Sequence, residues 1–215
     1  MILPVNKVFV FDLDDTLYSE RDFEKSGIEF VYNYFKIDPF EFGTAMKSRT
    51  NWIEQIVLQY DNFSTKDSIL DLYRYHKPQI ELYSSAKIFL EKLISFKVEM
   101  SLITDGRSIT QRNKLIALGI ESYFKNIIIS EEIRSEKPSE VNFKMVIDKN
   151  QKKEYVYIAD NTQKDFITPN KLGWTTICLL DKGQNVHKQN FGLPNEYLPQ
   201  FTINSFEDII LTNEY

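Results

Sequence analysis

The sequence predicts an α/β protein, a doubly wound parallel sheet that carries an inserted all-helical segment. From Ser84 onward, apolar runs of strand length alternate with segments of helical period, which is typical of βαβ units in a parallel sheet. In residues 19–83 the apolar residues recur at helical spacing only, which predicts a separate helical module. Short polar motifs directly follow several of the apolar runs, and ligands bind at the carboxyl ends of strands in open α/β sheets.

The first strand is expected over residues 7–11, because this β-branched and aromatic run is typical of a buried strand. Helical period follows, with Phe23, Phe30 and Tyr34 able to share one face. Candidate starts of further helices in this segment are Asp38-Pro39, Asn51 and Thr65. The segment is therefore expected to hold about four helices.

The remaining elements are predicted from the alternation of period. In order they are a helix over 85–96, a strand over 98–104, a helix over 108–118, a strand over 126–130, a helix over 139–149, a strand over 155–160, a helix over 163–172 and a strand over 175–180. Residues 181–200 are rich in Gly, Asn, Gln and Pro, which predicts an irregular surface loop. An edge strand at 201–203 and a short helix capped by Ser205 complete the core. Residues 1–18 and 84–215 are thus expected to form the α/β core, and residues 19–83 the helical insert.

Composition narrows the class of protein. The chain has 215 residues, 42% hydrophobic and 27% charged, which suffices for one core and a small second module. A net charge of −5 argues against a nucleic-acid partner. The single cysteine, Cys178, lies in a predicted core strand, so we expect a buried, inert thiol and a reducing compartment. No signal peptide and no apolar run of membrane-spanning length is present, so a cytoplasmic protein without a membrane partner is expected.

Four polar motifs carry the chemistry. They are Asp12-Leu13-Asp14-Asp15-Thr16, Thr104-Asp105-Gly106, Lys137-Pro138, and Asp160 with Asp165. They supply two acidic pairs, a hydroxyl and an ammonium group, which are the parts needed for Mg²⁺-assisted phosphoryl transfer through an aspartyl-phosphate. Taken alone, the first motif could also be a polar turn. A calcium loop fits it less well, because Leu17 stands where the turn glycine is needed and Phe23 where the bidentate acid is needed.

In their order and their positions after strands, these motifs resemble those of the haloacid dehalogenase superfamily. The resemblance implies that Asp12 is the nucleophile and Asp14 the general acid and base. It also implies a Mg²⁺ ion bound by Asp12, Asp160 and the backbone carbonyl of Asp14. The substrate phosphate would be bound by Thr104, Asp105, Gly106 and Lys137, of which Thr104 and Lys137 are also catalytic. Thr16 and Asp165 are expected to orient these groups.

The aspartate at position 14 is similar to that of the phosphatases and phosphomutases of the superfamily. The expected activity is therefore hydrolysis of a phosphomonoester of a small metabolite, either a sugar phosphate or a nucleoside monophosphate. A phosphomutase of the same fold and a non-catalytic ligand-binding module remain alternatives. The chain departs from the usual pattern at Ala159 and Thr162, at Ser139-Glu140, and in lacking a glycine between residues 132 and 136. None of these departures removes a reacting group.

The resemblance also implies that the helical insert is a cap of the C1 type over the active site. Within and beside it, cationic and hydrogen-bonding side chains are candidates for substrate specificity, namely Tyr18, Arg21, Lys47 and Arg49. His76 and His187 do not follow predicted strands, and no catalytic or metal role is expected for either. Arg107 could reach a substrate or lie on the surface. We expect a small phosphorylated metabolite as the partner, with Mg²⁺ as the cofactor, and a monomer or homodimer.

Overall fold

A computed structural model describes residues 1–38, 43, 52–59, 65–147 and 153–213. Its centre is a six-stranded, wholly parallel sheet with the strand order β4-β3-β2-β5-β6-β7. These strands are β2 (Val8–Phe11), β3 (Met100–Thr104), β4 (Asn126–Ile129), β5 (Tyr155–Ala159), β6 (Thr175–Leu179) and β7 (Phe201–Ile203). The order reverses direction at β2, as in a doubly wound sheet, so the predicted fold class is confirmed.

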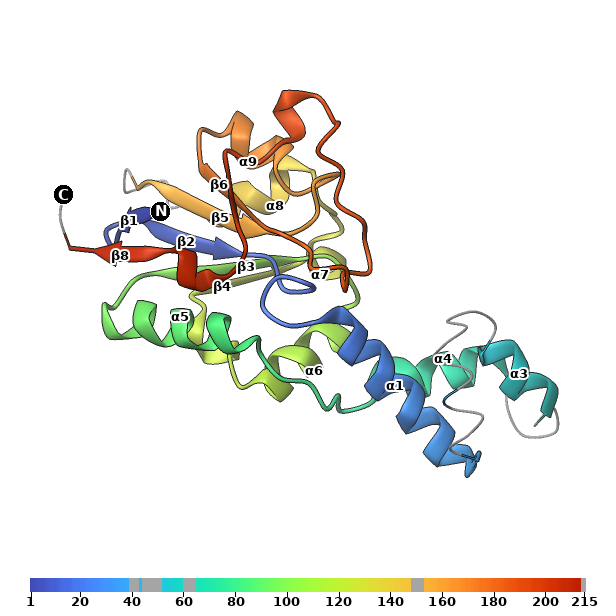
Figure 1. Ribbon diagram of the computed structural model, residues 1–215. Helices are drawn as coiled ribbons and strands as arrows, with labels where there is room; N and C mark the ends of the chain where they lie inside the picture. The colour runs from blue at the N-terminus through green and yellow to red at the C-terminus, as the bar shows by residue number, and fades with distance from the viewer. Residues whose placement is uncertain (39–42, 44–51, 60–64, 148–152, 214–215) are drawn as a thin grey trace.

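Helices cover both faces of the sheet (Figure 1). On one side lie α5 (Ser84–Ser95) and α6 (Ser108–Leu118), and on the other α8 (Glu140–Lys144) and α9 (Ile167–Lys171). The alternation of side chains along β2 assigns Phe9 and Phe11 to the core cluster shared with α5. Val8 and Val10 belong to the opposite cluster, with Phe143 of α8. Both faces of the central strand are therefore buried, which is why it reads as a continuous apolar run.

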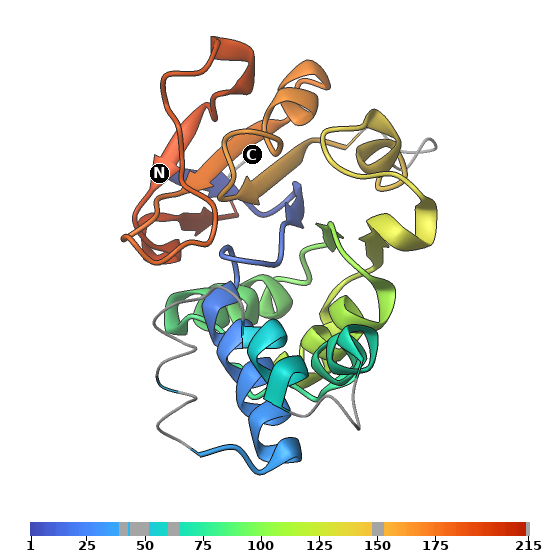
Figure 2. The same ribbon diagram turned by 90° about the vertical axis from the view of Figure 1, so that its right-hand side faces the viewer.

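The described helices of the insert lie together at one end of the molecule, where α1 (Glu20–Phe35) starts beside the end of β2 and extends outward (Figures 1 and 2). They are α1, α3 (Trp52–Gln59) and α4 (Lys66–Tyr75). They share an apolar cluster of their own, which includes Val31, Ile56 and Ile69. Thr65 caps α4 as predicted, because its side chain accepts the Ser68 N–H at 3.2 Å and Ser68 Oγ accepts the Thr65 N–H at 2.9 Å. The helix starts predicted at Asp38-Pro39 and Asn51 involve residues outside the described ranges.

Several elements differ from the sequence prediction. The first residues form two strands rather than one, because β1 (Ile2–Pro4) pairs with β8 (Ile210–Thr212) in a small separate sheet. The helix α7 (Ser130–Ile133) was not predicted; it ends at Arg134, which adopts a left-handed conformation with φ of 54°. The helix predicted over 163–172 begins only at Ile167. Residues before it form a tight turn, in which the Asn161 side chain accepts the Gln163 N–H at 3.0 Å.

The predicted C-terminal features are present. Besides the edge strand β7, the described residues include short 3₁₀ helices at Glu121–Tyr123, Asn195–Tyr197 and Phe206–Asp208. Ser205 caps the last of them through its side chain. Cys178 is buried in β6, and burial raises the pKa of its thiol, which fits the inert role expected of it. Among the described residues, no helix combines the length and apolar character needed to cross a membrane.

Candidate active site

The topology brings the polar motifs to one edge of the sheet. Phe11, the last residue of β2, is in register with Leu102 of β3 on one side and Ile158 of β5 on the other. Asp12, Thr104 and Asp160 therefore end up side by side at the carboxyl edge. A cavity of about 120 Å³ opens there. It is lined by Asp12, Asp14, Asp15, Glu20, Thr104, Asp105, Asp160, Asn161, Lys164 and His187.

Asp12 forms a buried charge cluster with Lys137. Lys137 Nζ lies 2.5 Å from Asp12 Oδ1 and 2.7 Å from Asp165 Oδ1, and its side chain is 1% exposed. Burial lowers the pKa of Lys137, but the two carboxylates outweigh it and hold the pKa well above its usual value. Burial and the nearby Asp165 raise the pKa of Asp12 to about 7, against the opposing effect of Lys137. The floor of the cavity thus holds a carboxylate that one ammonium only partly compensates.

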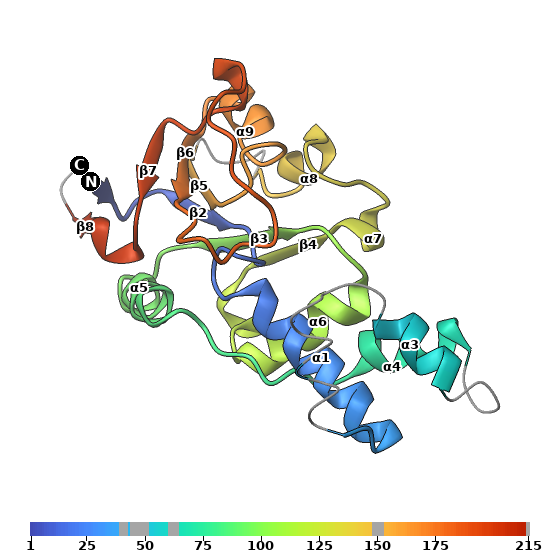
Figure 3. The same ribbon diagram turned by 45° about the vertical axis from the view of Figure 1, so that its right-hand side comes forward.

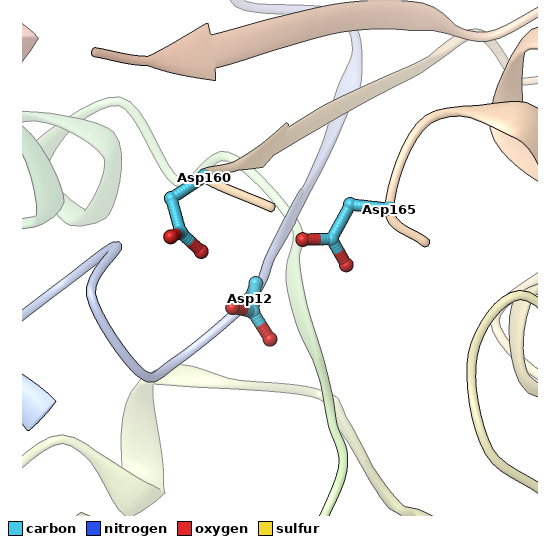
Figure 4. Close-up of side chains that lie close together, drawn as sticks. All are labelled: Asp12, Asp160 and Asp165. Carbon is cyan, nitrogen blue, oxygen red and sulfur yellow. The ribbon is translucent and has the colours of Figure 1, made fainter. Parts of the chain in front are cut away.

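Asp160 adds a second buried carboxylate, whose negative charge, within the described residues, is not balanced by an ammonium group as that of Asp12 is. Carboxylate oxygens of Asp12, Asp160 and Asp165 lie within 4.8 Å of one another, and Figure 4 shows the three groups converging from the ends of β2 and β5 and the turn after β5. Burial, together with the charges of Asp12 and Asp165, raises the pKa of Asp160 well above its usual value. Among the described residues its side chain has no ion pair and accepts one hydrogen bond, from the Asn185 amide at 2.8 Å.

Asp165 is committed to other partners. Its Oδ1 contacts Lys137 and accepts the Tyr157 hydroxyl at 3.2 Å, while its Oδ2 accepts the Asn161 N–H at 2.9 Å. This leaves Asp12 and Asp160 as the carboxylates with oxygens free for a divalent cation. Buried acidic groups without enough cationic partners fit such an ion, since Mg²⁺ prefers one or two carboxylates with waters and a substrate oxygen. Asp165 thus contacts Lys137 directly.

Asp14 lies in a network of donors. Its Oδ1 is 2.7 Å from Lys114 Nζ and also accepts the Tyr18 hydroxyl, and its Oδ2 accepts the Gln111 side-chain amide at 2.9 Å. Burial opposes ionisation of Asp14, but Lys114 and the hydrogen bonds outweigh it and lower its pKa. Lys114 also lies 4.3 Å from the centre of the Phe23 ring, so the charge that holds Asp14 contacts the insert as well. Lys114 was not among the site residues predicted from the sequence.

The second motif is built around Gly106. Its φ of 145° favours glycine, and a Cβ there would lie 3.1 Å from the Gln111 side chain. That glutamine donates to Thr104 Oγ1 at 2.5 Å as well as to Asp14, so the turn couples the two motifs. Asp105 does not cap α6, because Glu131 accepts the Ser108 N–H at 2.8 Å. The Asp105 carboxylate contacts Lys164 Nζ at 2.7 Å and accepts the Lys137 N–H at 3.0 Å.

The remaining sequence candidates lie in different places. Thr16 is buried and its hydroxyl is 3.4 Å from Asp12 Oδ2. Tyr18 is fully buried against Asp14 rather than exposed on the cap. Arg21 reaches the Asn185 carbonyl at 3.4 Å and is not part of the cavity wall. Arg107 faces Glu131 on the surface. Lys47 and Arg49 are outside the described residues.

Four cavity residues were not identified from the sequence: Glu20, Lys164, His187 and Asn161. Lys164 lies within the fourth motif, between Asp160 and Asp165, so its position was a usable signal. Glu20 is the first residue of α1, and His187 lies on the long loop after β6. The two histidines differ: His76 is buried against Phe23 with Nδ1 2.6 Å from the Tyr73 carbonyl, whereas His187 is exposed at the cavity.

The cavity wall gives a prediction for the pH dependence of stability. Burial, followed by the charge of Asp14, raises the pKa of Glu20 to about 8 from 4.5. The folded protein therefore keeps a proton that the unfolded chain releases near pH 4.5, and the free energy of unfolding falls as the pH rises toward 8. In EDTA, we expect Glu20→Gln to melt like the wild type at pH 4.5 and several degrees higher at pH 8.5. A gain on the order of 2 kcal/mol would produce this shift.

The exposed Glu29 on the same helix supplies the control. Glu29→Gln should melt like the wild type at both pH values. Equal melting temperatures for Glu20→Gln and the wild type across the whole range would show that Glu20 is ionised in the folded protein.

Comparison with known proteins identifies the family. Residues 9–179 match the profile of the haloacid dehalogenase-like hydrolases. The chain belongs to this family. The match runs from the second residue of β2 to the end of β6 and includes all four polar motifs, so the resemblance inferred from those motifs is confirmed, as is the prediction of a hydrolase.

Relatives and solved structures of this hydrolase family agree with the match. The chain is 28% identical to glyceraldehyde 3-phosphate phosphatase of Methanocaldococcus jannaschii and 24% identical to that of Methanopyrus kandleri, with 95% of each chain covered in both cases. Among solved structures, the magnesium-bound HAD hydrolase YfnB of Bacillus subtilis superimposes with a TM-score of 0.64 at 18% identity, covering 94% of this chain and 96% of that one. The likeness to the solved structure supports the fold alone, whereas both relatives are named as phosphatases.

Proposed function

We propose that this hydrolase is a Mg²⁺-dependent phosphatase, which cleaves a phosphomonoester of a small metabolite through an aspartyl-phosphate on Asp12. One observation carries the proposal: in a cavity that also holds Thr104, a buried carboxylate lies beside an ammonium group at 2.5 Å and beside a second carboxylate, which has no ion pair among the described residues. This arrangement presents a nucleophile together with positive charge for a phosphoryl group. The relatives named as phosphatases support the same reaction.

Asp12 attacks phosphorus in line with the bond to the leaving oxygen. A bond forms between an Asp12 carboxylate oxygen and phosphorus, and the bond to the leaving alkoxide breaks. Asp14, which lines the same cavity, supplies the proton that the alkoxide takes up, and then accepts a proton from the water that cleaves the aspartyl-phosphate. The lowered pKa of Asp14 means that its carboxylate is ionised in the present conformation, which suits the acceptance of a proton from water. Proton donation requires Asp14 to be released from Lys114.

Several residues supply positive charge or hydrogen bonds to the phosphoryl group. Lys137 neutralises Asp12 as it approaches an anionic substrate, and the Thr104 hydroxyl offers a hydrogen bond to a phosphoryl oxygen. The Gly106 N–H donates to Ser130 Oγ at 2.9 Å in this conformation. Lys164 adds a second ammonium group to the cavity wall. Asp12, Asp160 and the Asp14 carbonyl are the proposed ligands of Mg²⁺, which when bound offsets the repulsion between carboxylate and phosphoryl oxygens. Thr16 and Asp165 hold Asp12 and Lys137 in position.

The size of the cavity favours a small substrate. At about 120 Å³ it is below the roughly 300–1,000 Å³ of pockets for drug-sized ligands. Of the two classes expected from the sequence, a sugar phosphate of about three carbons fits this space better than a nucleoside monophosphate. The relatives named glyceraldehyde 3-phosphate phosphatase point to the same size class. We propose a triose-sized phosphomonoester as the substrate.

We further propose that residues 19–83 are a cap that limits this space. The insert has a separate apolar cluster, yet its first helix begins with Glu20 in the cavity wall and its Phe23 packs on Lys114. Movement of the insert would therefore alter both the volume of the cavity and the partners of Asp14. Such closure would exclude water until the leaving group has departed.

The test is phosphate release from a panel of phosphorylated metabolites, from glyceraldehyde 3-phosphate to nucleoside monophosphates, with Mg²⁺ or with EDTA. We expect the highest kcat/KM for three-carbon phosphates and a loss of at least about 100-fold in EDTA, restored by Mg²⁺. Release in EDTA at the full rate would contradict the metal requirement. Transfer of phosphate to a second sugar instead of water would indicate a phosphomutase.

A further inference from the structure

The loop after β6 is built to hold a fixed position. The Asp181 carboxylate accepts the N–H groups of Gly183, Gln184 and Asn185 at 2.7–3.0 Å. The Gln189 side chain accepts the Asp181 N–H at 3.0 Å and donates to the Leu179 carbonyl at 2.7 Å. Residues 181–190, here termed the β6 loop, are thus cross-linked by hydrogen bonds although they form no helix or strand.

The β6 loop is also attached to the active site. The Asn185 amide donates to Asp160 Oδ2 at 2.8 Å, and the Val186 N–H donates to Asp15 Oδ2 at 2.7 Å. From the insert, Arg21 reaches the Asn185 carbonyl. Figure 3 shows the loop descending from β6 to the point where β2 leads into α1. A segment predicted as surface loop therefore covers the carboxyl edge of the sheet.

His187 directly follows these anchors and lines the catalytic cavity. Its side chain is exposed, and in the described part of the chain neither ring nitrogen has a hydrogen bond or an ion pair. By contrast, Asp12 and Thr104 on the cavity floor are 6% and 1% exposed. A phosphoryl group bound at Asp12 therefore occupies the buried end, and the rest of a substrate extends toward the rim where His187 lies.

We propose that His187 is a specificity-determining residue, which forms a hydrogen bond with a hydroxyl or carbonyl group on the leaving portion of the substrate. The imidazole offers one donor and one acceptor when neutral, so it suits either group. This inference rests on the proposed phosphatase function and adds the chemistry of the leaving group: hydroxylated or carbonyl-bearing rather than apolar. The anchored β6 loop keeps the imidazole in place, which reduces the entropic cost of the contact.

Two substrates of equal length separate hydrogen bonding from size. Glycerol 3-phosphate and propyl phosphate both carry three carbons, but only the first has hydroxyl groups beyond the ester. We expect the wild type to prefer glycerol 3-phosphate in kcat/KM by about 10-fold, the usual range for one or two hydrogen bonds. His187→Ala should reduce this ratio by about 5-fold or more with little change for propyl phosphate, and His187→Gln should keep most of it.

Lys188→Ala provides the matched control, because Lys188 is exposed on the same loop and is not part of the cavity wall. It should leave the ratio unchanged. An unchanged ratio in a folded His187→Ala protein, or no preference in the wild type, would overturn the role of His187 while phosphatase activity stands. If the wild type releases phosphate from no member of the metabolite panel, the proposed function itself fails.

Discussion

Replacing Asp12 by asparagine is expected to abolish phosphatase turnover while leaving the fold intact. The amide has nearly the shape of the carboxylate but cannot form the acyl-phosphate bond, and it removes one proposed Mg²⁺ ligand. A loss of kcat on the order of 10⁴-fold or more is expected when a nucleophile is removed. The surroundings raise the pKa of the Asp12 carboxyl group, which means that the folded protein disfavours its charged form. A neutral amide at this position should therefore not lower the melting temperature appreciably.

Two measurements separate the role of Asp12 from a general effect on the protein. Asp22→Asn, an exposed change on α1, should leave turnover unchanged. Rapid acid quenching of the wild type with a ³²P-labelled substrate should trap label on the protein, and Asp12→Asn should trap none. Full activity in Asp12→Asn would exclude it as the nucleophile. Label that remains on the variant would place the phosphoenzyme on another residue.

Much of the fold could be predicted because its signals are local. The alternation between strand-length apolar runs and helical spacing of apolar residues located the strands of the main sheet. It also predicted α6 over residues 108–118, which the structure confirms. Motifs at strand ends were enough to predict that Asp12, Thr104 and Asp160 meet, because parallel strands present their carboxyl ends at one edge. The pairing of β1 with β8 was missed, since it joins the two ends of the chain and neither strand has more than three residues.

The partners of the site residues were harder to predict than the residues themselves. Asp14 stood out by its spacing from Asp12, but Lys114 is 100 positions away, within the helix α6 and outside the four polar motifs. The β6 loop has a polar composition that predicts a surface segment. Hydrogen bonds of Asp181 and Gln189 to backbone groups hold the loop in shape, and hydrogen bonds from Asn185 to Asp160 and from Val186 to Asp15 attach it to the active site. The spacing of apolar residues along the sequence carries no information on such contacts.

Lys137→Met is expected to cost both activity and stability. The methionine fills a similar volume but leaves Asp12 and Asp165 facing each other without the ammonium that now lies 2.5 and 2.7 Å from them. Removing one partner of a buried ion pair destabilises a protein by about 3–5 kcal/mol, and a drop of about 6–20 °C in melting temperature follows for a chain of this size. The phosphoryl group also loses a donor in a buried site, for which a loss in kcat of about 10²–10³-fold is expected.

A second substitution distinguishes these two effects. In Lys137→Met combined with Asp12→Asn, the repulsion between carboxylates is removed, so stability should recover in part while activity stays absent. Lys144→Met is the matched surface control, because Lys144 pairs with Glu140 in an exposed ion pair, and it should cost well under about 1 kcal/mol. If Lys137→Met were as stable as the Lys144 variant, the two buried carboxylates would not need the ammonium for stability, and the predicted stabilising role of Lys137 would be wrong.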